Sequence, residues 1–290
     1  MEINPFLYVA FLLGFLAGRI VRPHTPWVGR ITLVNVGLLV GLLGASLDLV
    51  PPAQLLATIP LSLGFVAIIL GCTVGIYFLV VRARPPPPSS SPPTAHTGER
   101  RVPVSLLLLA ALLGGYSIGH FVVLPTSTGL TWALYALLAL VAFDLKLSTV
   151  GLRRLWVPLT AAVGGSVLGA ALFVTLTGIS LPAAFATSLA FGWYTLAGPL
   201  VGARLGAVLG LLAFTTNFLR EDLTMLFSPL VGRRLRGEGL VAIGGATSMD
   251  TTLYFVTRYG DREAASLSLA SGLVLTIAAS LLLPAVLALA

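Results

Sequence analysis

Apolar runs long enough to cross a lipid bilayer recur from one end of this chain to the other. They cover 5–21, 31–49, 59–82, 104–122, 129–146, 156–178, 182–201, 205–231, 239–257 and 264–289. Only 9% of the residues are charged and the mean hydropathy is +1.00, whereas a soluble domain carries about 25% charged residues. The sequence therefore predicts an all-α polytopic membrane protein, with about eight to ten transmembrane or re-entrant helices.

The basic residues predict the orientation of the chain. Because Lys and Arg favour cytoplasmic loops, the net charge of +7 is read as a topology signal and not as a nucleic-acid site. Alternate loops hold most of these residues, including Arg19, Arg22, Arg30, Arg82, Arg84, Arg100, Arg101, Lys146, Arg153, Arg154, Arg204, Arg258 and Arg262. This places the N-terminus outside the cytoplasmic (inner) membrane. Three residues fall on the other side, which suggests that 205–231 enters and returns: Arg233, Arg234 and Arg236.

Internal repeats divide the chain. "GFLAGR" (14–19) matches "GYSIGH" (115–120), and residues 47–71 align without a gap with 145–169. Each copy holds three spans, an odd number, so the second copy is inverted, as in transporters that work by alternating access. We expect a first repeat over 1–84, a Pro/Ser-rich cytoplasmic linker over 85–101, an inverted repeat over 102–180, and a region with broken helices over 181–290. A weaker match links 200–206 to 254–260.

Several chemistries have no support in the sequence. Cys72 is the single cysteine, and the three histidines are scattered, so we expect no metal site. No G-x-x-x-x-G-K-[ST] loop is present, which argues against an ATP-driven pump within this chain. We expect no cofactor and no enzymatic activity.

A polar stripe interrupts the segment 205–231. Asn217, Arg220, Glu221 and Thr224 stand at i, i+3, i+4 and i+7, on one face of a helix, and Asp222 lies off that face. Charged groups inside a membrane are expensive and mark functional sites, whereas Asp48, Asp144 and Lys146 lie near segment ends. The alternative is a short charged loop at the membrane surface.

The stretch "GGATSMDTTLYF" (244–255) places hydroxyls and a carboxylate between apolar runs. "T-S-M-D" fits a capping box with Thr247 as the N-cap and Asp250 at N3, so a half-helix would begin at Ser248. With Thr251, this break would form a cation site, and the alternative is that Asp250 only caps a helix at the surface. "FGWYTLAGPL" (191–200), which includes Tyr194, predicts a second break. We expect the chain near 244–248 and 193–199 to be non-helical at membrane depth and to meet.

These motifs together carry a resemblance. "FGWYTLAGPL", "NFLRE" followed by "SPLVGRR", and "GGATSMDTTL" with "RYG" resemble, in this order, the LysO-type lysine exporter family. The resemblance is close over roughly 185–262 and covers only the segment layout in the N-terminal half. It departs at Tyr254 and Phe255, where family members often have Pro, and in the proline-rich linker. The resemblance implies export of L-lysine, with Glu221 and Asp250 as the important acids.

The leading hypothesis is a secondary exporter of a cationic amino acid driven by proton antiport. Glu221 and Asp250, around one aqueous cavity, would hold either a proton or the substrate ammonium, and the substrate carboxylate would meet the half-helix at Ser248. The other expected substrate contacts are Asn217, Thr247, Ser248, Thr251 and Tyr194. A Na⁺/proton exchanger stays open, and an intramembrane aspartyl protease is disfavoured because the nearest motif is "RYGD" (258–261). The expected partners are L-lysine, protons and lipid, with a homodimer left open.

Overall fold

Regular structure in the described part of the chain is entirely helical. The computed structural model describes residues 5–21, 26–47, 51–82, 104–122, 125–144, 152–249, 252–260 and 264–290. The predicted linker 85–101 lies outside these residues. In a bilayer every backbone N–H and C=O group needs a partner within the protein, which the helix supplies. The predicted all-α fold is therefore confirmed.

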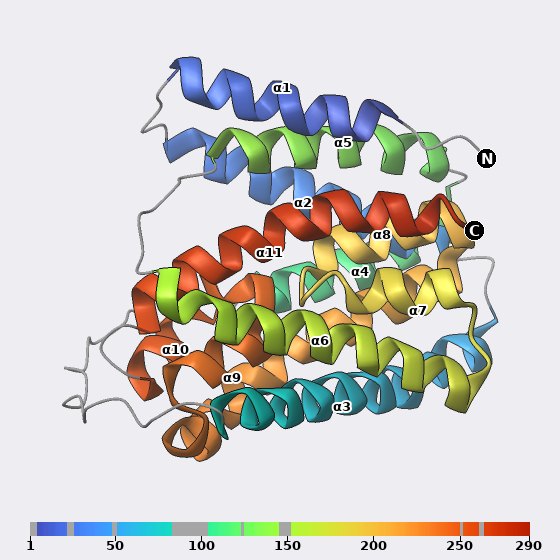
Figure 1. Ribbon diagram of the computed structural model, residues 1–290. Helices are drawn as coiled ribbons and strands as arrows, with labels where there is room; N and C mark the ends of the chain where they lie inside the picture. Colours follow the sequence, from blue (N-terminus) through green and yellow to red (C-terminus); the bar gives the residue numbers. More distant parts are fainter. Residues whose placement is uncertain are drawn as a thin grey trace.

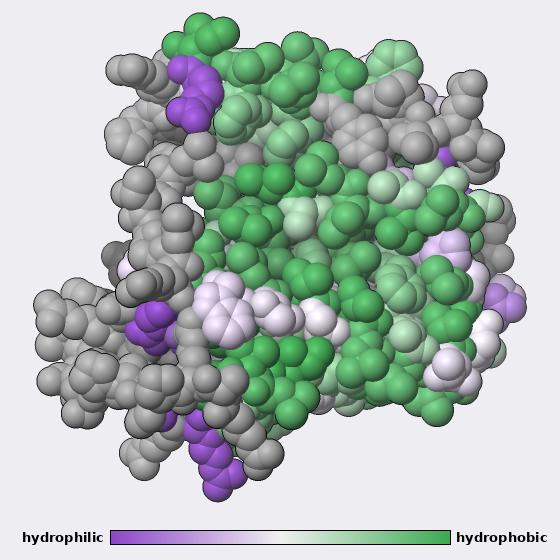
Figure 2. Space-filling view, viewed as in Figure 1, coloured by the Kyte–Doolittle hydropathy of each residue, from purple (hydrophilic) through white to green (hydrophobic). Residues whose placement is uncertain are grey.

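The first six helices lie roughly parallel or antiparallel to one another (Figure 1). They are α1 (Pro5–Val21), α2 (Pro26–Ser46), α3 (Pro52–Arg82), α4 (Val104–Gly119), α5 (Thr126–Asp144) and α6 (Leu152–Thr177). Among the described residues, three stretches are long and apolar enough to cross a membrane: Leu56–Val81, Arg154–Thr177 and Ala264–Leu287. Figure 2 shows hydrophobic side chains across the visible face, with the strongest hydrophilic colour at one end of the helices. The chain is thus a multi-pass membrane protein.

Glycines let the first six helices approach closely, and they do so in matched pairs. A Cβ on Gly14 or Gly18 of α1 would lie 2.1 or 2.2 Å from the carbonyl oxygen of Ala139 or Phe143 in α5. A Cβ on Gly115 or Gly119 of α4 would lie 1.9 or 2.6 Å from the carbonyl oxygen of Gly41 or Ala45 in α2. These four glycines are those of the matched sequences "GFLAGR" and "GYSIGH". The two motifs therefore make equivalent contacts, α1 with α5 and α4 with α2.

Beyond α6 the chain forms the first of two re-entrant units. Helix α7 (Leu181–Ser188) runs inward from the end of the molecule where both termini lie, and α8 (Tyr194–Leu205) runs back to that end (Figure 1). We call α7, residues 189–193 and α8 the first hairpin. Helix α9 (Ala207–Gly244) then runs to the opposite end. There its path breaks at Arg236, whose φ of 54° and ψ of −175° are not helical.

The second re-entrant unit starts at that break. Residues 237–244 run back inward, the 3-10 turn η1 (Gly245–Met249) follows, and α10 (Leu253–Tyr259) returns. The return is tight, because a Cβ on Gly260 would lie 3.0 Å from the Cα of Gly237. We call residues 237–249 and 252–260 the second hairpin. Helix α11 (Ala264–Leu287) then crosses the molecule (Figure 1).

This topology places four arginines at the opposite end of the molecule from the one predicted. Arg233, Arg234 and Arg236 were expected on the side opposite to the other basic residues, but the break of α9 lies at the end where α1 and α3 finish (Figure 1). An ion pair confirms this neighbourhood, because Arg154 Nε at the start of α6 lies 2.7 Å from Glu238 Oε1. Arg204, expected with the majority, lies instead in the last turn of α8 at the other end. Hydropathy could not show that α8 turns back.

Candidate substrate site where two broken helices meet

The tips of the two hairpins touch through their backbones. The N–H of Ala246 donates a hydrogen bond of 2.9 Å to the carbonyl oxygen of Phe191. Gly245 has a φ of 65°, and a Cβ there would lie 2.3 Å from that same oxygen, so no side chain fits at this position. The predicted meeting of two broken helices is therefore present, although Tyr194 and Pro199, expected to be non-helical, lie within α8.

Asn217 of α9 fastens the first hairpin. Its Oδ1 accepts a 2.8 Å hydrogen bond from the N–H of Gly192, and its Nδ2 donates to the carbonyl oxygens of Thr187 at 2.8 Å and Ala213 at 2.9 Å. Phe191 and Gly192 have positive φ angles of 53° and 97°, which end the helical pattern. Asn217 was predicted to contact substrate, but its amide holds the break in place.

Arg220, one turn further along α9, fastens the second hairpin. Its Nε and Nη2 donate to the carbonyl oxygens of Ile243 at 3.1 Å and Ala242 at 3.3 Å, and Nη1 donates to Ser166 Oγ at 3.2 Å. The side chain is 1% exposed. The last carbonyls of a helix lack partners within it and attract positive charge, so the guanidinium stabilises the end of residues 237–244. The sequence placed Arg220 on the polar face but gave it no role.

The hydroxyls of Thr247, Ser248 and Thr252 satisfy carbonyl groups of the second break. Thr247 Oγ1 donates to Gly244 O at 2.9 Å, Ser248 Oγ to Gly245 O at 2.7 Å, and Thr252 Oγ1 to Thr247 O at 3.0 Å. The predicted capping box is wrong, because the half-helix begins at Leu253 and not at Ser248, and its N-cap Thr252 makes no side-chain cap bond. Asp250 and Thr251 lie outside the described residues.

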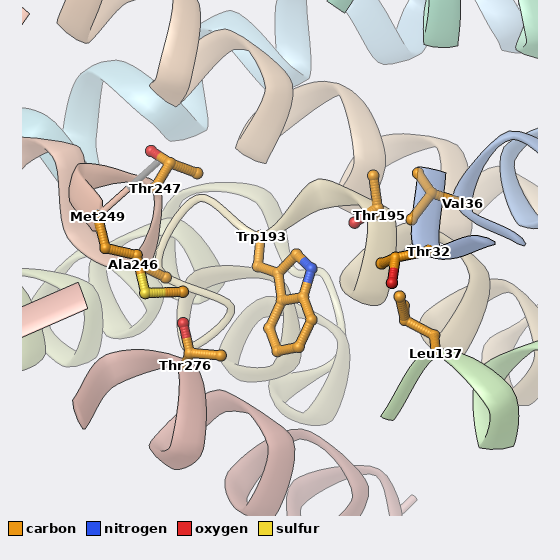
Figure 3. A pocket seen from close by; sticks show the side chains of 9 residues that line it. All are labelled: Thr32, Val36, Leu137, Trp193, Thr195, Ala246, Thr247, Met249 and Thr276. Atoms are coloured by element: carbon orange, nitrogen blue, oxygen red, sulfur yellow. The ribbon is translucent and has the colours of Figure 1, made fainter. Parts of the chain in front are cut away.

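A cavity of about 190 Å³ opens beside the two tips (Figure 3). One water needs roughly 10–15 Å³ of such space, so the cavity holds several waters or a small organic molecule. Its polar groups come from four threonines, one indole and one thioether: Thr32, Thr195, Thr247, Thr276, Trp193 and Met249. The cavity lies at mid-depth, because Leu137 and Thr276 in its wall stand near the middle of α5 and α11.

Only some of the predicted site residues line this cavity. Thr247 lines the cavity, whereas Ser248, Asn217 and Glu221 are buried and are not among the lining residues. Glu221 is 2% exposed. Tyr194 packs edge-on against Phe214 and Phe218, with ring centroids 5.4 and 5.6 Å away. Tyr194 is therefore a core residue, and its two neighbours in the sequence line the cavity instead.

Four cavity residues were missed by the sequence analysis: Thr32, Trp193, Thr195 and Thr276. Trp193 and Thr195 lie within the stretch that was predicted to be broken, so the motif was the available signal. Thr32 and Thr276 lie in apolar helices that carry other hydroxyl residues as well, and nothing in their sequence neighbourhood distinguishes them from hydroxyls bonded within a helix. Among the described residues no group of three metal-binding side chains occurs.

In this membrane-embedded helical bundle, two re-entrant broken helices meet beside a cavity that carries a few hydroxyl groups and an indole. This is the construction of secondary transporters, whose substrate sites lie at mid-depth between discontinuous helices.

Comparison with known proteins gives the family. The profile of the family described as Lysine exporter LysO matches residues 109–287, more than half of the chain, and the chain belongs to this family. It is 26% identical over 288 residues to Lysine exporter LysO of Escherichia coli (strain K12), covering 96% of both chains. It is 25% identical over 189 residues to a Haemophilus influenzae protein named "Putative lysine exporter", covering 61% of this chain and 94% of that one. No solved structure matches. The family indicates a transporter rather than an enzyme.

Proposed function

We propose that this protein exports L-lysine across the cytoplasmic membrane in exchange for protons. The observation that carries the proposal is the meeting of two broken helices, through Ala246 and Phe191, beside a mid-depth cavity in a member of the lysine exporter family. Moving the positive charge of lysine outward opposes the membrane potential by about 2.3 kcal/mol per 100 mV. One incoming proton cancels this electrical term.

The basic end of the molecule is proposed to be cytoplasmic. This end holds Arg19 in the last turn of α1, Arg154 at the start of α6, and Arg234 and Arg236 at the break of α9. Arginine favours the cytoplasmic side of a membrane. Both described ends of the chain lie at the other end (Figure 1), so the N-terminus is proposed to be outside.

The chain is also proposed to consist of inverted repeats. Helix α1 pairs with α5 as α4 pairs with α2, and equivalent glycines make both contacts. Helices α1 and α4 run in opposite directions (Figure 1), as copies related by an axis in the membrane plane would. The two hairpins with α9 and α11 form the second pair of copies. Such symmetry lets a protein open to either side by exchanging two similar conformations.

Glu221 and Asp250 are proposed as the acids that couple proton movement to transport. Glu221 follows Arg220 on α9, on the same helical face as Asn217 and Arg220, which hold the two breaks. Glu221 is buried and does not line the cavity, so its contact with a substrate ammonium requires a rearrangement of the site. Asp250 follows Met249 of the cavity wall in the sequence, and its role rests on that sequence alone.

Counterflow in proteoliposomes tests this function. Liposomes loaded with unlabelled L-lysine should accumulate labelled lysine, and an outward lysine gradient should drive protons inward. Glu221→Gln and Asp250→Asn should both remove lysine-driven proton movement, while Asp222→Asn, off the polar face, should change it little. Counterflow of Na⁺ in place of lysine would overturn the assignment in favour of a Na⁺/proton exchanger.

A further inference from the structure

One end of the cavity presents donor groups that have no hydrogen-bond partner in the part of the chain that the structure describes. Thr195 is 7% exposed, lines the cavity, and its hydroxyl makes no hydrogen bond in the described part of the chain. The Trp193 indole N–H is likewise without a partner among the described residues. Figure 3 shows the Trp193 nitrogen on the side of the ring that faces Thr195 and Thr32. Buried polar groups without partners destabilise a protein, unless a ligand or water occupies the space.

The backbone adds a further donor at the same place. Helix α8 has 12 residues and begins at Tyr194. The N–H groups of Leu196 and Ala197 both turn to the carbonyl oxygen of Trp193, at 3.3 and 3.0 Å, and that of Tyr194 bonds to Gly192 O at 2.9 Å. The N–H of Thr195 has no partner in the described chain. The first turn of α8 contains no acidic residue, so the positive end of its dipole is open to an anion.

We propose that this end of the cavity binds the α-carboxylate of the substrate, held by the Thr195 N–H, the Thr195 hydroxyl and the Trp193 indole N–H. This inference rests on the proposed function and deepens it, since it names the chemical class of the substrate: an α-amino acid with a free carboxylate. It also moves the carboxylate from the second hairpin, where the sequence placed it, to the first.

The opposite wall of the cavity suits the ammonium groups. Thr247 and Thr276 present hydroxyl oxygens, and Met249 presents a polarisable sulfur (Figure 3). Thr276 is 2% exposed, and its hydroxyl has no hydrogen-bond partner among the described residues. The polar groups of the cavity thus differ at its two ends, with donors at the first hairpin and acceptors at the second hairpin and α11. A cation without a carboxylate would leave the donors unpaired, which is the strongest form of discrimination between ligands.

Ligands that differ only in the carboxylate test the proposal. Binding of L-lysine, L-lysine amide and 1,5-diaminopentane is measured by titration calorimetry with the full chain in detergent. The wild type should bind lysine at least about tenfold more tightly than either analogue, since a hydrogen bond to a charged group is worth about 1.5–3 kcal/mol. Thr195→Val and Trp193→Phe should weaken lysine binding about tenfold and leave diaminopentane binding unchanged.

Two control variants accompany these changes. Thr195→Ser keeps the hydroxyl and should keep the preference for lysine. Thr175→Val alters an exposed threonine of α6, whose hydroxyl bonds to Leu172 O, and should leave every affinity unchanged.

The outcomes separate this inference from the proposed function. Equal weakening of lysine and diaminopentane in Thr195→Val, or equal affinity of the two in the wild type, would overturn the carboxylate site while leaving export of lysine intact. If a different α-amino acid bound in place of lysine and lost affinity in Thr195→Val, the site would be supported and the lysine assignment would fail. Absence of binding by every α-amino acid would overturn both.

Discussion

The first hairpin ends its inward helix at Ser188 and turns through Phe191 and Gly192, whereas the second ends at Gly244 and turns through Gly245 and a 3-10 turn. The first is held by a neutral amide, that of Asn217, and the second by a charged guanidinium, that of Arg220. Asn217 and Arg220, which we call the neutral clamp and the charged clamp, lie on one face of α9, three residues apart. The comparison shows that the two breaks are held by different chemistry, a neutral amide at one and a charged guanidinium at the other.

The largest difference between the hairpins should follow from removing the charged clamp. Arg220→Met keeps the length of the side chain and deletes the donors to Ala242, Ile243 and Ser166. Hydrogen bonds to charged groups contribute about 1.5–3 kcal/mol each, so we expect the free energy of unfolding to fall by roughly 3 kcal/mol or more, with loss of lysine counterflow. Thermal unfolding in detergent and proteoliposome assays measure this. Arg220→Lys should have a stability and a transport rate between those of the wild type and Arg220→Met. Wild-type transport by Arg220→Met would show that Arg220 is not needed to hold the second hairpin.

The neutral clamp should matter less than the charged one. Asn217→Leu leaves the Gly192 N–H and the Thr187 carbonyl without partners, at about 1–3 kcal/mol each. We expect a fall of about 2–3 kcal/mol in the free energy of unfolding. The matched control is Thr224→Val on the same buried face, because its hydroxyl bonds only within α9, to Arg220 O. If Thr224→Val lowered the free energy of unfolding as much as Asn217→Leu, the polarity of this helical face, and not the bonds of Asn217 to the first hairpin, would explain the stabilisation.

The two tips should also differ in their tolerance of a methyl group. Gly245→Ala places a Cβ 2.3 Å from Phe191 O, whereas the nearest atom to a Cβ on Gly192 is Gly244 O at 3.4 Å. Both positions have positive φ, so both variants carry backbone strain of about 1–2 kcal/mol. Gly245→Ala must in addition break the contact between the tips. We expect a lower melting temperature and slower counterflow for Gly245→Ala than for Gly192→Ala, and the reverse order would mean that the tips do not need to touch.

The smallest effect concerns the start of the second hairpin. Arg236 holds a φ of 54° although it is not glycine, and its side chain is exposed. Arg236→Gly should therefore raise the free energy of unfolding by about 0.5–1 kcal/mol. Arg234→Gly, at a helical position nearby, should lower it by about 1 kcal/mol. Differential scanning calorimetry of the two variants tests whether the free energy of unfolding changes in opposite directions. Destabilisation by Arg236→Gly would show that the Arg236 side chain has a structural role.

Several features of the fold could be predicted because they depend on local pattern. The buried face of Asn217, Arg220, Glu221 and Thr224 followed from the helical period alone, and all four are at most 2% exposed. The match of "GFLAGR" with "GYSIGH" pointed to glycines that make equivalent contacts. The site was harder, since Tyr194 packs in the core while Trp193 and Thr195 line the cavity. Adjacent residues point in different directions, and the start of α8 at Tyr194 decides which.

The sequence by itself determined that the chain is a helical membrane protein, that its helices break within the stretches 191–200 and 244–255, and that one face of α9 is polar. These properties follow from hydropathy, glycine and helical periodicity, which act over a few turns of chain. Only the tertiary structure decided that α8 turns back, that Arg236 and not Arg204 lies at the end where α1 and α3 finish, and that the cavity gathers threonines from α2, α8, η1 and α11. A cavity between separate helices depends on how their faces pack, and no single segment encodes that.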